Sequence, residues 1–316
     1  MQGAGIFSSV NSGLFALSQL HFPSQARQGG ARQSTNNRHK LKGRPILGYS
    51  ERFAGKTVLI TGGGTGIGAE VARRVAGEGA NVVLMGRRAA PLEAVAAEFG
   101  GTVIAGDAAS TADVKAAVAQ IVAKFGGLDI LIANAGGHGV GPTMETSDDA
   151  WQLATRLNLD TAFVCARESL PELIKTKGNI VIVASIAGLF AGPGAVGYVT
   201  MKHACIGLGK SLARDFGRYG VRTNMICPGW VSTAMADEQM AVLMTEAGLP
   251  SVDAAYALVT KDVPAGRAAT PEEVSNVICF VASPEAVMMN GSIVTVDGGS
   301  SVVDLPTLAF YQPPTV

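Results

Sequence analysis

The sequence predicts an α/β protein with a doubly wound parallel sheet of about seven strands, covered by helices on both faces in three layers. Three observations lead to this prediction. From Phe53 onward, short runs rich in Val and Ile alternate with segments of helical apolar spacing. The runs are apolar throughout, as in strands that are buried on both faces. The first run enters its helix through a glycine-rich turn, and such strand–helix alternation is typical of parallel sheets.

The strands are predicted from the apolar runs in chain order. The first, KTVLIT, is apolar except at its ends, and the second, NVVLM, is apolar after its first residue. The last, GSIVTVDGG, ends in a glycine turn. The predicted strands are residues 56–61, 81–85, 101–106, 128–134, 178–185, 221–227 and 291–299.

The helices are predicted between the strands, where apolar residues recur three or four positions apart. Ile67, Val71 and Val75 share one face of the first helix. Ser110 or Thr111 is expected to cap the third helix. The predicted helices are residues 66–79, 90–100, 110–126, 148–174, 198–218 and 270–283.

Two local signals refine these helices. Pro171 is expected to disturb the end of the helix 148–174, because proline lacks the N–H that an α-helix uses. Thr270 and Glu273 have the spacing of a capping box. No internal repeat or linker divides the chain after Phe53. The predicted organisation is an extension at 1–52, one domain at 53–300 with a lid at about 230–267, and a tail at 301–316.

Composition limits the possible classes of protein. The chain has 316 residues, 47% of them hydrophobic and 16% charged, and its formal net charge is zero. These values indicate a core-rich protein and give no argument for nucleic-acid binding. No apolar run approaches the length of a membrane span, and no cluster has metal-ligand spacing. Four cysteines lie apart in apolar segments and are predicted to be buried, reduced thiols: Cys165, Cys205, Cys227 and Cys279.

The first fifty residues differ from the rest in charge. They hold six basic residues and no acidic one, so the other 19 basic and 25 acidic side chains give residues 51–316 a formal charge of −6. This serine-rich segment is predicted to be a separate, poorly ordered extension. Its composition resembles an organelle transit peptide, and a tag-like extension or a start codon placed too early fits equally well. A cytoplasmic location is expected, with organelle import through this segment as the alternative.

The turn TGGGTGIG, residues 61–68, indicates dinucleotide binding. It joins the first strand to its helix, where Gly62, Gly66 and Gly68 let the backbone turn tightly and approach a pyrophosphate at the helix N-terminus. A phosphate loop of the Walker type is disfavoured, because no Gly-Lys-Ser/Thr follows.

The chain resembles the single-domain branch of the short-chain dehydrogenase/reductase family, with its Rossmann-type fold, from Phe53 to about Ser300. The glycine turn fits the family pattern Thr-Gly-x-x-x-Gly-x-Gly, NAGG at 134–137 fits its Asn-Ala-Gly motif, and PGWVST at 228–233 fits its Pro-Gly segment. The resemblance implies an oxidoreductase that moves a hydride between a nicotinamide cofactor and a secondary alcohol or ketone. The cofactor-binding residues that it implies are Thr61, Gly62, Thr65, Gly66, Ile67, Gly68, Arg87, Asp107, Ala108, Asn134, Ala135, Gly136, Tyr198, Lys202, Pro228, Gly229, Val231 and Thr233.

The resemblance also implies a catalytic set of Asn158, Ser185, Tyr198 and Lys202. A free phenol is a poor base near neutrality, with a pKa of about 10, and a neighbouring ammonium favours its ionised form. Lys202 lies one helical turn after Tyr198 and is placed to do this. Tyr198 is then the general acid/base, Ser185 binds the substrate oxygen, and Asn158 supports a water-linked proton path to Lys202.

NADP(H) is favoured over NAD(H) as the cofactor. Gly86 stands at the end of the second strand, where relatives that use NAD carry an acidic residue for the ribose hydroxyls. Arg87 follows, and a guanidinium suits a 2′-phosphate. Against this, Thr65 stands where many NADP-dependent relatives have a basic residue. Asp107 matches the aspartate that contacts adenine in the family.

The substrate and the assembly are less specified. The segment from Trp230 to Arg267 corresponds to the substrate lid of the family, and His138 is expected at the rim of the pocket.

A 3-oxoacyl-carrier-protein reductase shares the same motifs but would need a basic docking patch, for which Arg167, Arg214 and Arg218 are candidates. A catalytically idle binding module is the alternative of another class. The family implies a homotetramer or homodimer.

Overall fold

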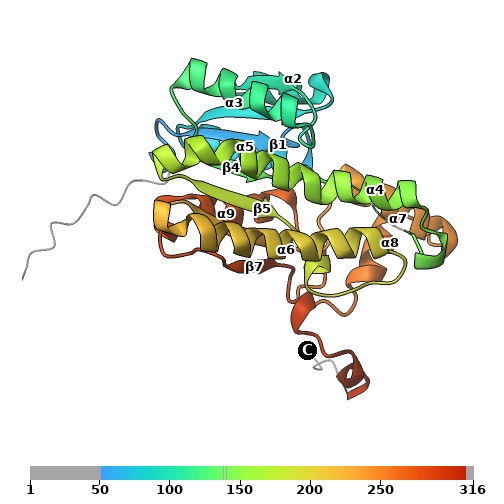
Figure 1. Cartoon of the computed structure of the whole chain (residues 1–316). Helices are drawn as coiled ribbons and strands as arrows, with labels where there is room; N and C mark the ends of the chain where they lie inside the picture. Colours follow the sequence, from blue (N-terminus) through green and yellow to red (C-terminus); the bar gives the residue numbers. More distant parts are fainter. Residues whose placement is uncertain (1–50, 138, 140, 311–316) are drawn as a thin grey trace, which may run out of the picture. The chain divides into compact units, whose positions relative to one another are not determined.

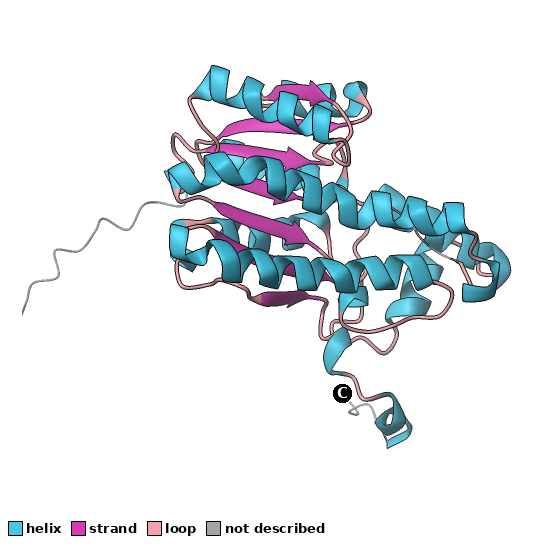
Figure 2. Cartoon of the chain, viewed as in Figure 1, coloured by secondary structure: helices cyan, strands magenta, loops and turns pink. Residues whose placement is uncertain are grey.

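A computed structural model describes residues 51–137, 139 and 141–310 of the chain. The basic extension, His138 and the end of the tail at 311–316 lie outside this range. The described residues contain a sheet of seven parallel strands, as predicted (Figure 2), and the strand order is β3-β2-β1-β4-β5-β6-β7. The strands are β1 (Thr57–Thr61), β2 (Asn81–Gly86), β3 (Thr102–Ala105), β4 (Ile130–Ala133), β5 (Asn179–Val183), β6 (Arg222–Pro228) and β7 (Ile293–Val296).

Helices cover both faces of this sheet. In Figure 1, α3, α5 and α6 cross in front of the strands and α9 lies behind them. The α-helices are α1 (Gly66–Gly77), α2 (Ala89–Ala97), α3 (Thr111–Phe125), α4 (Asp148–Thr155), α5 (Thr161–Thr176), α6 (Val196–Phe216), α7 (Ala234–Glu246), α8 (Val252–Thr260) and α9 (Pro271–Ala282). Short 3₁₀ turns are η2 (Thr143–Glu145), η4 (Ile186–Gly188), η5 (Gly217–Tyr219), η6 (Pro284–Ala286), η7 (Ser300–Val302) and η8 (Leu305–Phe310).

The predicted caps form, and the helix that contains Pro171 runs past it, as the predicted end at Ile174 requires. The Ser110 hydroxyl accepts a hydrogen bond from Asp113 N at 3.3 Å at the start of α3. Thr270 and Glu273 make both hydrogen bonds of the capping box of α9. α5 continues through Pro171 to Thr176. The packing of buried Leu170 and Leu173 on the core outweighs the one backbone hydrogen bond that proline removes.

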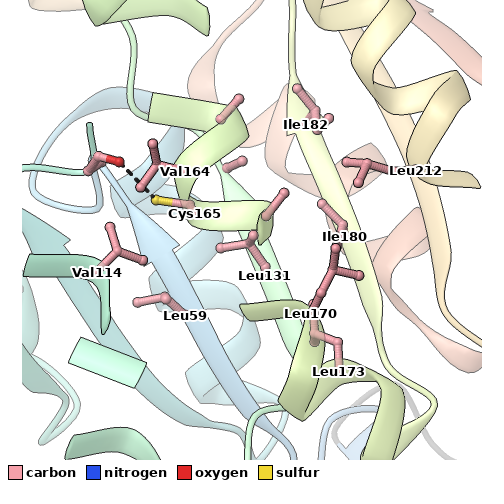
Figure 3. Packing of buried hydrophobic residues seen from close by; sticks show 14 of the residues in the cluster. Leu59, Val114, Leu131, Val164, Cys165, Leu170, Leu173, Ile180, Ile182 and Leu212 are labelled. Carbon is pink, nitrogen blue, oxygen red and sulfur yellow. Dashed lines mark hydrogen bonds between the residues drawn. The ribbon is translucent and has the colours of Figure 1, made fainter. Parts of the chain in front are cut away.

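The core lies on both faces of the sheet, because successive residues of a strand point to opposite sides. Leu59 faces α3 and α5, while its neighbours Val58 and Ile60 belong to the cluster on the opposite face. Figure 3 shows residues of the cluster that contains Leu59, among them Cys165. The Cys165 thiol donates to Ala108 O at 3.4 Å. Burial raises the pKa of this thiol to about 12. All four cysteines are free and buried, as predicted.

The strand order creates the position for a site. The chain runs outward from β1 to β2 and β3, and then crosses back to β4 on the other side of β1. The loops that leave β1 and β4 therefore diverge at the carboxyl ends of these strands, which is where ligands bind in open α/β sheets. Among the described residues, no helix is long and apolar enough to cross a membrane, and no group of three acidic, His or Cys side chains could hold a metal ion.

Candidate active site

The glycine turn between β1 and α1 is folded tightly against itself. Gly62 and Gly66 have φ angles of +66° and +54°, which favour glycine. A Cβ on Gly68 would lie 2.4 Å from the carbonyl oxygen of Gly62, so this position has no room for a side chain. Thr65 precedes the helix with an exposed side chain, and Ile67 packs at the edge of the core.

Asn134 joins the glycine turn to the end of β4 through hydrogen bonds. Its amide nitrogen donates to Thr61 O at 3.0 Å and to Gly62 O at 3.2 Å. In return, the Thr61 hydroxyl accepts from the backbone N–H groups of Asn134 and Ala135 at 3.1 and 3.0 Å. The two loops at the topological switch of the sheet are thus held together by four hydrogen bonds.

This arrangement fits a dinucleotide. Within the described residues, no side-chain hydrogen bond caps the start of α1, and the first turn of α1 carries no acidic residue. The backbone N–H groups of that turn and the positive end of the helix dipole therefore suit a phosphate group. Thr233 lies across from the turn, since a Cβ on Gly66 would be 3.2 Å from its methyl group. The segment that follows Pro228 and Gly229 therefore lies against the glycine turn at Thr233 and Gly66.

Lys202 and Tyr198 meet on the first turns of α6. The Lys202 ammonium lies 5.6 Å from the centre of the Tyr198 ring and donates to Val183 O at 3.0 Å. The lysine side chain is buried, with the residue 5% exposed. Gly136 lies beside it, because a Cβ there would be 3.6 Å from Lys202 Nζ and 3.5 Å from Asn158 Oδ1. The structure therefore brings Gly136, Asn158, Tyr198 and Lys202 together from three separate segments.

Asn158 lies in a π-helical turn, η3 (Arg156–Asp160), between α4 and α5. The sequence analysis predicted one continuous helix here and not this irregularity. The Asn158 side chain accepts from Gly137 N at 3.2 Å and donates to Ala154 O at 3.1 Å. Thr161, just after the turn, donates to Ala135 O at 3.1 Å. Since π-helical turns are rare and occur often at functional sites, the turn marks this segment as part of the site.

The remaining predicted residues line the carboxyl ends of β5 and β6. Ser185 follows β5, and its hydroxyl accepts from Ala187 N at 3.1 Å at the start of η4. Pro228 ends β6, and Gly229 lies against the backbone of Asp297, where a Cβ would be 3.0 Å from Cα. Val231 is buried and pairs with Ala269, which fixes the start of the lid.

Asp107 and Arg87 lie at the opposite end of the candidate cofactor site, after β3 and β2. Burial acts to raise the pKa of Asp107, but the Ala109 N–H and the guanidinium groups of Arg156 and Arg87 outweigh it and hold that pKa below its ordinary value. Arg87 is exposed, and Ala108 is buried beside Asp107. The Arg156 guanidinium donates to the Asp107 carboxylate at 2.7 Å, and the charge of Arg87 acts on the same carboxylate.

The lid consists of α7 and α8, which pack together after β6. Tyr256 of α8 donates to Asp237 of α7 at 2.8 Å. Burial and this hydrogen bond raise the pKa of Tyr256, so its hydroxyl stays a donor. Of the arginines considered for docking, Arg214 follows Tyr198 by sixteen residues on α6, about 24 Å along the helix axis.

Three residues at the site were not singled out in the sequence. Gly137 donates its N–H to Asn158, the Val183 carbonyl accepts from Lys202, and the Arg156 guanidinium contacts Asp107. The only signal for Arg156 in the sequence is its place two residues before Asn158 on the predicted helix. Backbone groups such as the Val183 carbonyl leave no signal in a sequence.

Comparison with known proteins gives consistent matches over the described sheet. The family model described as enoyl-(acyl carrier protein) reductase matches residues 62–301. Protein MoaE of Klebsiella aerogenes is 45% identical over 256 residues, which cover 81% of this chain and 99% of MoaE. Meso-2,3-butanediol dehydrogenase of Serratia marcescens is 36% identical over 256 residues, which cover 80% of this chain and 97% of that enzyme.

Solved structures agree with these relatives. Levodione reductase superposes with a TM-score of 0.75 at 31% identity, covering 80% of this chain and 100% of its own. L-sorbose reductase from Gluconobacter frateurii, complexed with NADPH and L-sorbose, has a TM-score of 0.73 at 32% identity and covers 78% of this chain and 97% of its own. The residues that the family model matches contain β2 to β7 and the residues of the site from Gly62 onward.

Proposed function

Because this chain belongs to the short-chain dehydrogenase/reductase family, we propose that it transfers a hydride between NADP(H) and a secondary alcohol or ketone, with Tyr198 as the general acid/base. The observation that carries the proposal is the buried Lys202 ammonium, 5.6 Å from the centre of the Tyr198 ring. A cation at this place stabilises the phenolate that forms when the hydroxyl gives up its proton.

Each residue of the catalytic set has one task in the proposed reaction. The nicotinamide, when bound, supplies or accepts the hydride. Tyr198 donates its proton to the carbonyl oxygen in reduction and takes it back in oxidation. Ser185 donates a hydrogen bond to the same oxygen and orients it. Asn158 holds the π-helical turn beside Gly137 and, as its family resemblance implies, supports a water-linked proton path to Lys202.

NADP(H) is the proposed cofactor. Gly86 ends β2 without a carboxylate, and the exposed Arg87 follows it, close enough to Asp107 for its charge to lower the pKa of that carboxyl. A planar guanidinium pairs with a phosphate through two parallel hydrogen bonds. The structurally similar L-sorbose reductase was solved with NADPH, which supports the same choice here.

The proposed substrate is a small alcohol or ketone without a negative charge. From Trp230 to Arg267, the lid carries five acidic and two basic residues, and this net negative charge disfavours an anion. Phe190, Trp230 and Met235 expose 51, 37 and 46% of their surface and offer apolar contacts around the carboxyl ends of β5 and β6. A basic docking patch for a carrier protein is not supported by Arg214, which lies about 24 Å from Tyr198 along α6.

The proposed assembly is a homotetramer or homodimer through α4–α5 and α6, with α9 and β7 forming a further contact. Phe163 on α5 and Phe280 on α9 are 43 and 40% exposed, so their own subunit leaves part of each aromatic ring uncovered. In the tail, Val302, Leu305 and Phe310 are 74–83% exposed, and a neighbouring subunit would cover them.

Replacing Tyr198 by Phe tests the function. The change keeps the ring and removes the proton, so the variant should fold, bind NADPH and lose nearly all turnover. Tyr219→Phe is the matched control, because Tyr219 lies in η5 at the other end of α6. The assay is a panel of neutral ketones with NADPH and NADH. Turnover of Tyr198→Phe within a few fold of the control would remove Tyr198 from the mechanism, and no turnover of the parent would favour an idle binding module.

A further inference from the structure

An ion pair joins the two ends of the candidate site. The Arg156 guanidinium donates to Asp107 Oδ2 at 2.7 Å, although the two residues are 49 positions apart in the sequence. Arg156 belongs to the π-helical turn that carries Asn158, whereas Asp107 lies between β3 and α3 at the expected adenine end. The pair therefore ties the π-helical turn of Asn158 to the loop after β3.

The carboxylate of Asp107 is held from several sides. Its Oδ1 accepts from Ala109 N at 2.9 Å, and its own backbone N–H donates to Asp113 Oδ2 at 2.8 Å. Arg156 occupies the other oxygen, and the charge of Arg87 acts on it as well. The Ala109 and Asp113 contacts are local and Arg87 acts through its charge, so Arg156 supplies the hydrogen bond that ties the carboxylate to a distant element.

The π-helical turn is likewise held by contacts that reach outward. A π-helical turn is less stable than a continued α-helix and persists only where its surroundings support it. On the β4 side, Asn158 accepts from Gly137 N and Thr161 donates to Ala135 O. On the adenine side, Arg156 supplies the ion pair with Asp107. Together these contacts fix the turn against two different strand ends.

We propose that Arg156 is a positioning residue that holds the carboxylate at the adenine end and the turn carrying Asn158 as one unit. Ordering of Asp107 by the adenine then also orders Asn158, and the converse holds. This inference rests on the proposed function, in which Asp107 contacts adenine and Asn158 serves catalysis. The Arg156 side chain is half exposed, and an exposed ion pair of this kind changes the affinity for a ligand by up to about fivefold.

Variants of Arg156 and Asp107 test the proposal in the full-length protein. Arg156→Gln should weaken NADPH binding, followed by nucleotide fluorescence, by about three- to fivefold. It should also lower kcat and speed hydrogen exchange at the Gly137 amide in the cofactor-free protein, because Gly137 donates to Asn158. Arg156→Lys should restore part of each effect. Adding Asp107→Asn to Arg156→Gln should cost much less than the two single changes together.

The matched control is Arg73→Gln, which removes a surface arginine paired with Glu98 at 2.7 Å, on α1 and away from the site. Arg156→Gln behaving like this control in NADPH affinity, kcat and Gly137 exchange would overturn the proposal. A lower melting temperature of Arg156→Gln with unchanged NADPH affinity, kcat and Gly137 exchange would also overturn it, because Arg156 would then have a structural role alone. If the parent reduced no ketone, the proposed function would fail, while NADPH affinity and Gly137 exchange would still decide the role of Arg156.

Discussion

Gly68→Ala should damage the glycine turn although it adds only one methyl group. The new Cβ would lie 2.4 Å from Gly62 O and 2.6 Å from Asn134 Nδ2. The first neighbour is backbone, and the second is the amide that bonds Thr61 O and Gly62 O, so neither atom can move without breaking the contact between β1 and β4. Gly77→Ala in the same helix is the matched control, because a Cβ there meets nothing within 4 Å.

The magnitude follows from these contacts. Forcing a methyl group into a closely packed site costs about 1–3 kcal/mol. Losing one of the Asn134 hydrogen bonds adds about 1 kcal/mol. For a domain of this size, 1 kcal/mol corresponds to about 2–4 °C, so the melting temperature should fall by roughly 5–15 °C. The exposed Gly77→Ala should instead gain about 0.5–1 kcal/mol, since alanine favours the helix.

Thermal unfolding without cofactor measures both changes at one protein concentration. NADPH titration of the folded variants then separates stability from binding, and Gly68→Ala should bind at least about tenfold more weakly, a loss of about 1.4 kcal/mol. A Gly68→Ala protein that melts with the parent and binds NADPH equally well would refute the packing argument. If the melting temperature of Gly77→Ala fell as far as that of Gly68→Ala, the effect would not be local to the turn.

Four further predictions concern other parts of the chain. Arg87→Ala should raise the KM for NADPH much more than that for NADH, because NADH has no 2′-phosphate to lose contact with; equal rises would end the case for NADP. The hydrogen bond from Arg267 and the cap of α9 hold the pKa of Glu273 at about 2, below its unfolded value of about 4.3. The stability that Glu273 adds is therefore complete above about pH 4.3 and lost as the pH falls towards 2. Glu273→Gln should accordingly melt below the parent at pH 7, with a gap that narrows under about pH 4, and a gap independent of pH would contradict this. A chain starting at Arg52 should keep its melting temperature and turnover, because the buried start of the fold begins there; insoluble protein would argue otherwise. A chain ending at Ser300 should form a smaller or less stable assembly in light scattering than the full chain, whereas identical assembly, stability and KM would leave the tail without the proposed role.

Local signals in the sequence were sufficient for the strands and for most helix ends. The capping box of Thr270 and Glu273 joins residues three apart, so its chemistry is legible without the fold. The continuous apolar strands likewise required burial on both faces. The π-helical turn Arg156–Asp160 shows the limit of this approach, because it interrupts the predicted helix 148–174 and is held by contacts to distant segments.

The sequence by itself determined that this protein has a parallel, doubly wound sheet, a glycine turn suited to a pyrophosphate, and a tyrosine and lysine one helical turn apart. The glycine turn and the tyrosine–lysine pair depend on interactions within a few residues, and the parallel sheet is predicted from which residues are apolar and therefore buried. Only the tertiary structure decided that Lys202 bonds the Val183 carbonyl, that Asn158 lies in a π-helical turn beside Gly137, and that Arg156 pairs with Asp107. These contacts join segments 19 to 49 residues apart, and the approach of such segments is set by the strand order and helix packing of the whole domain.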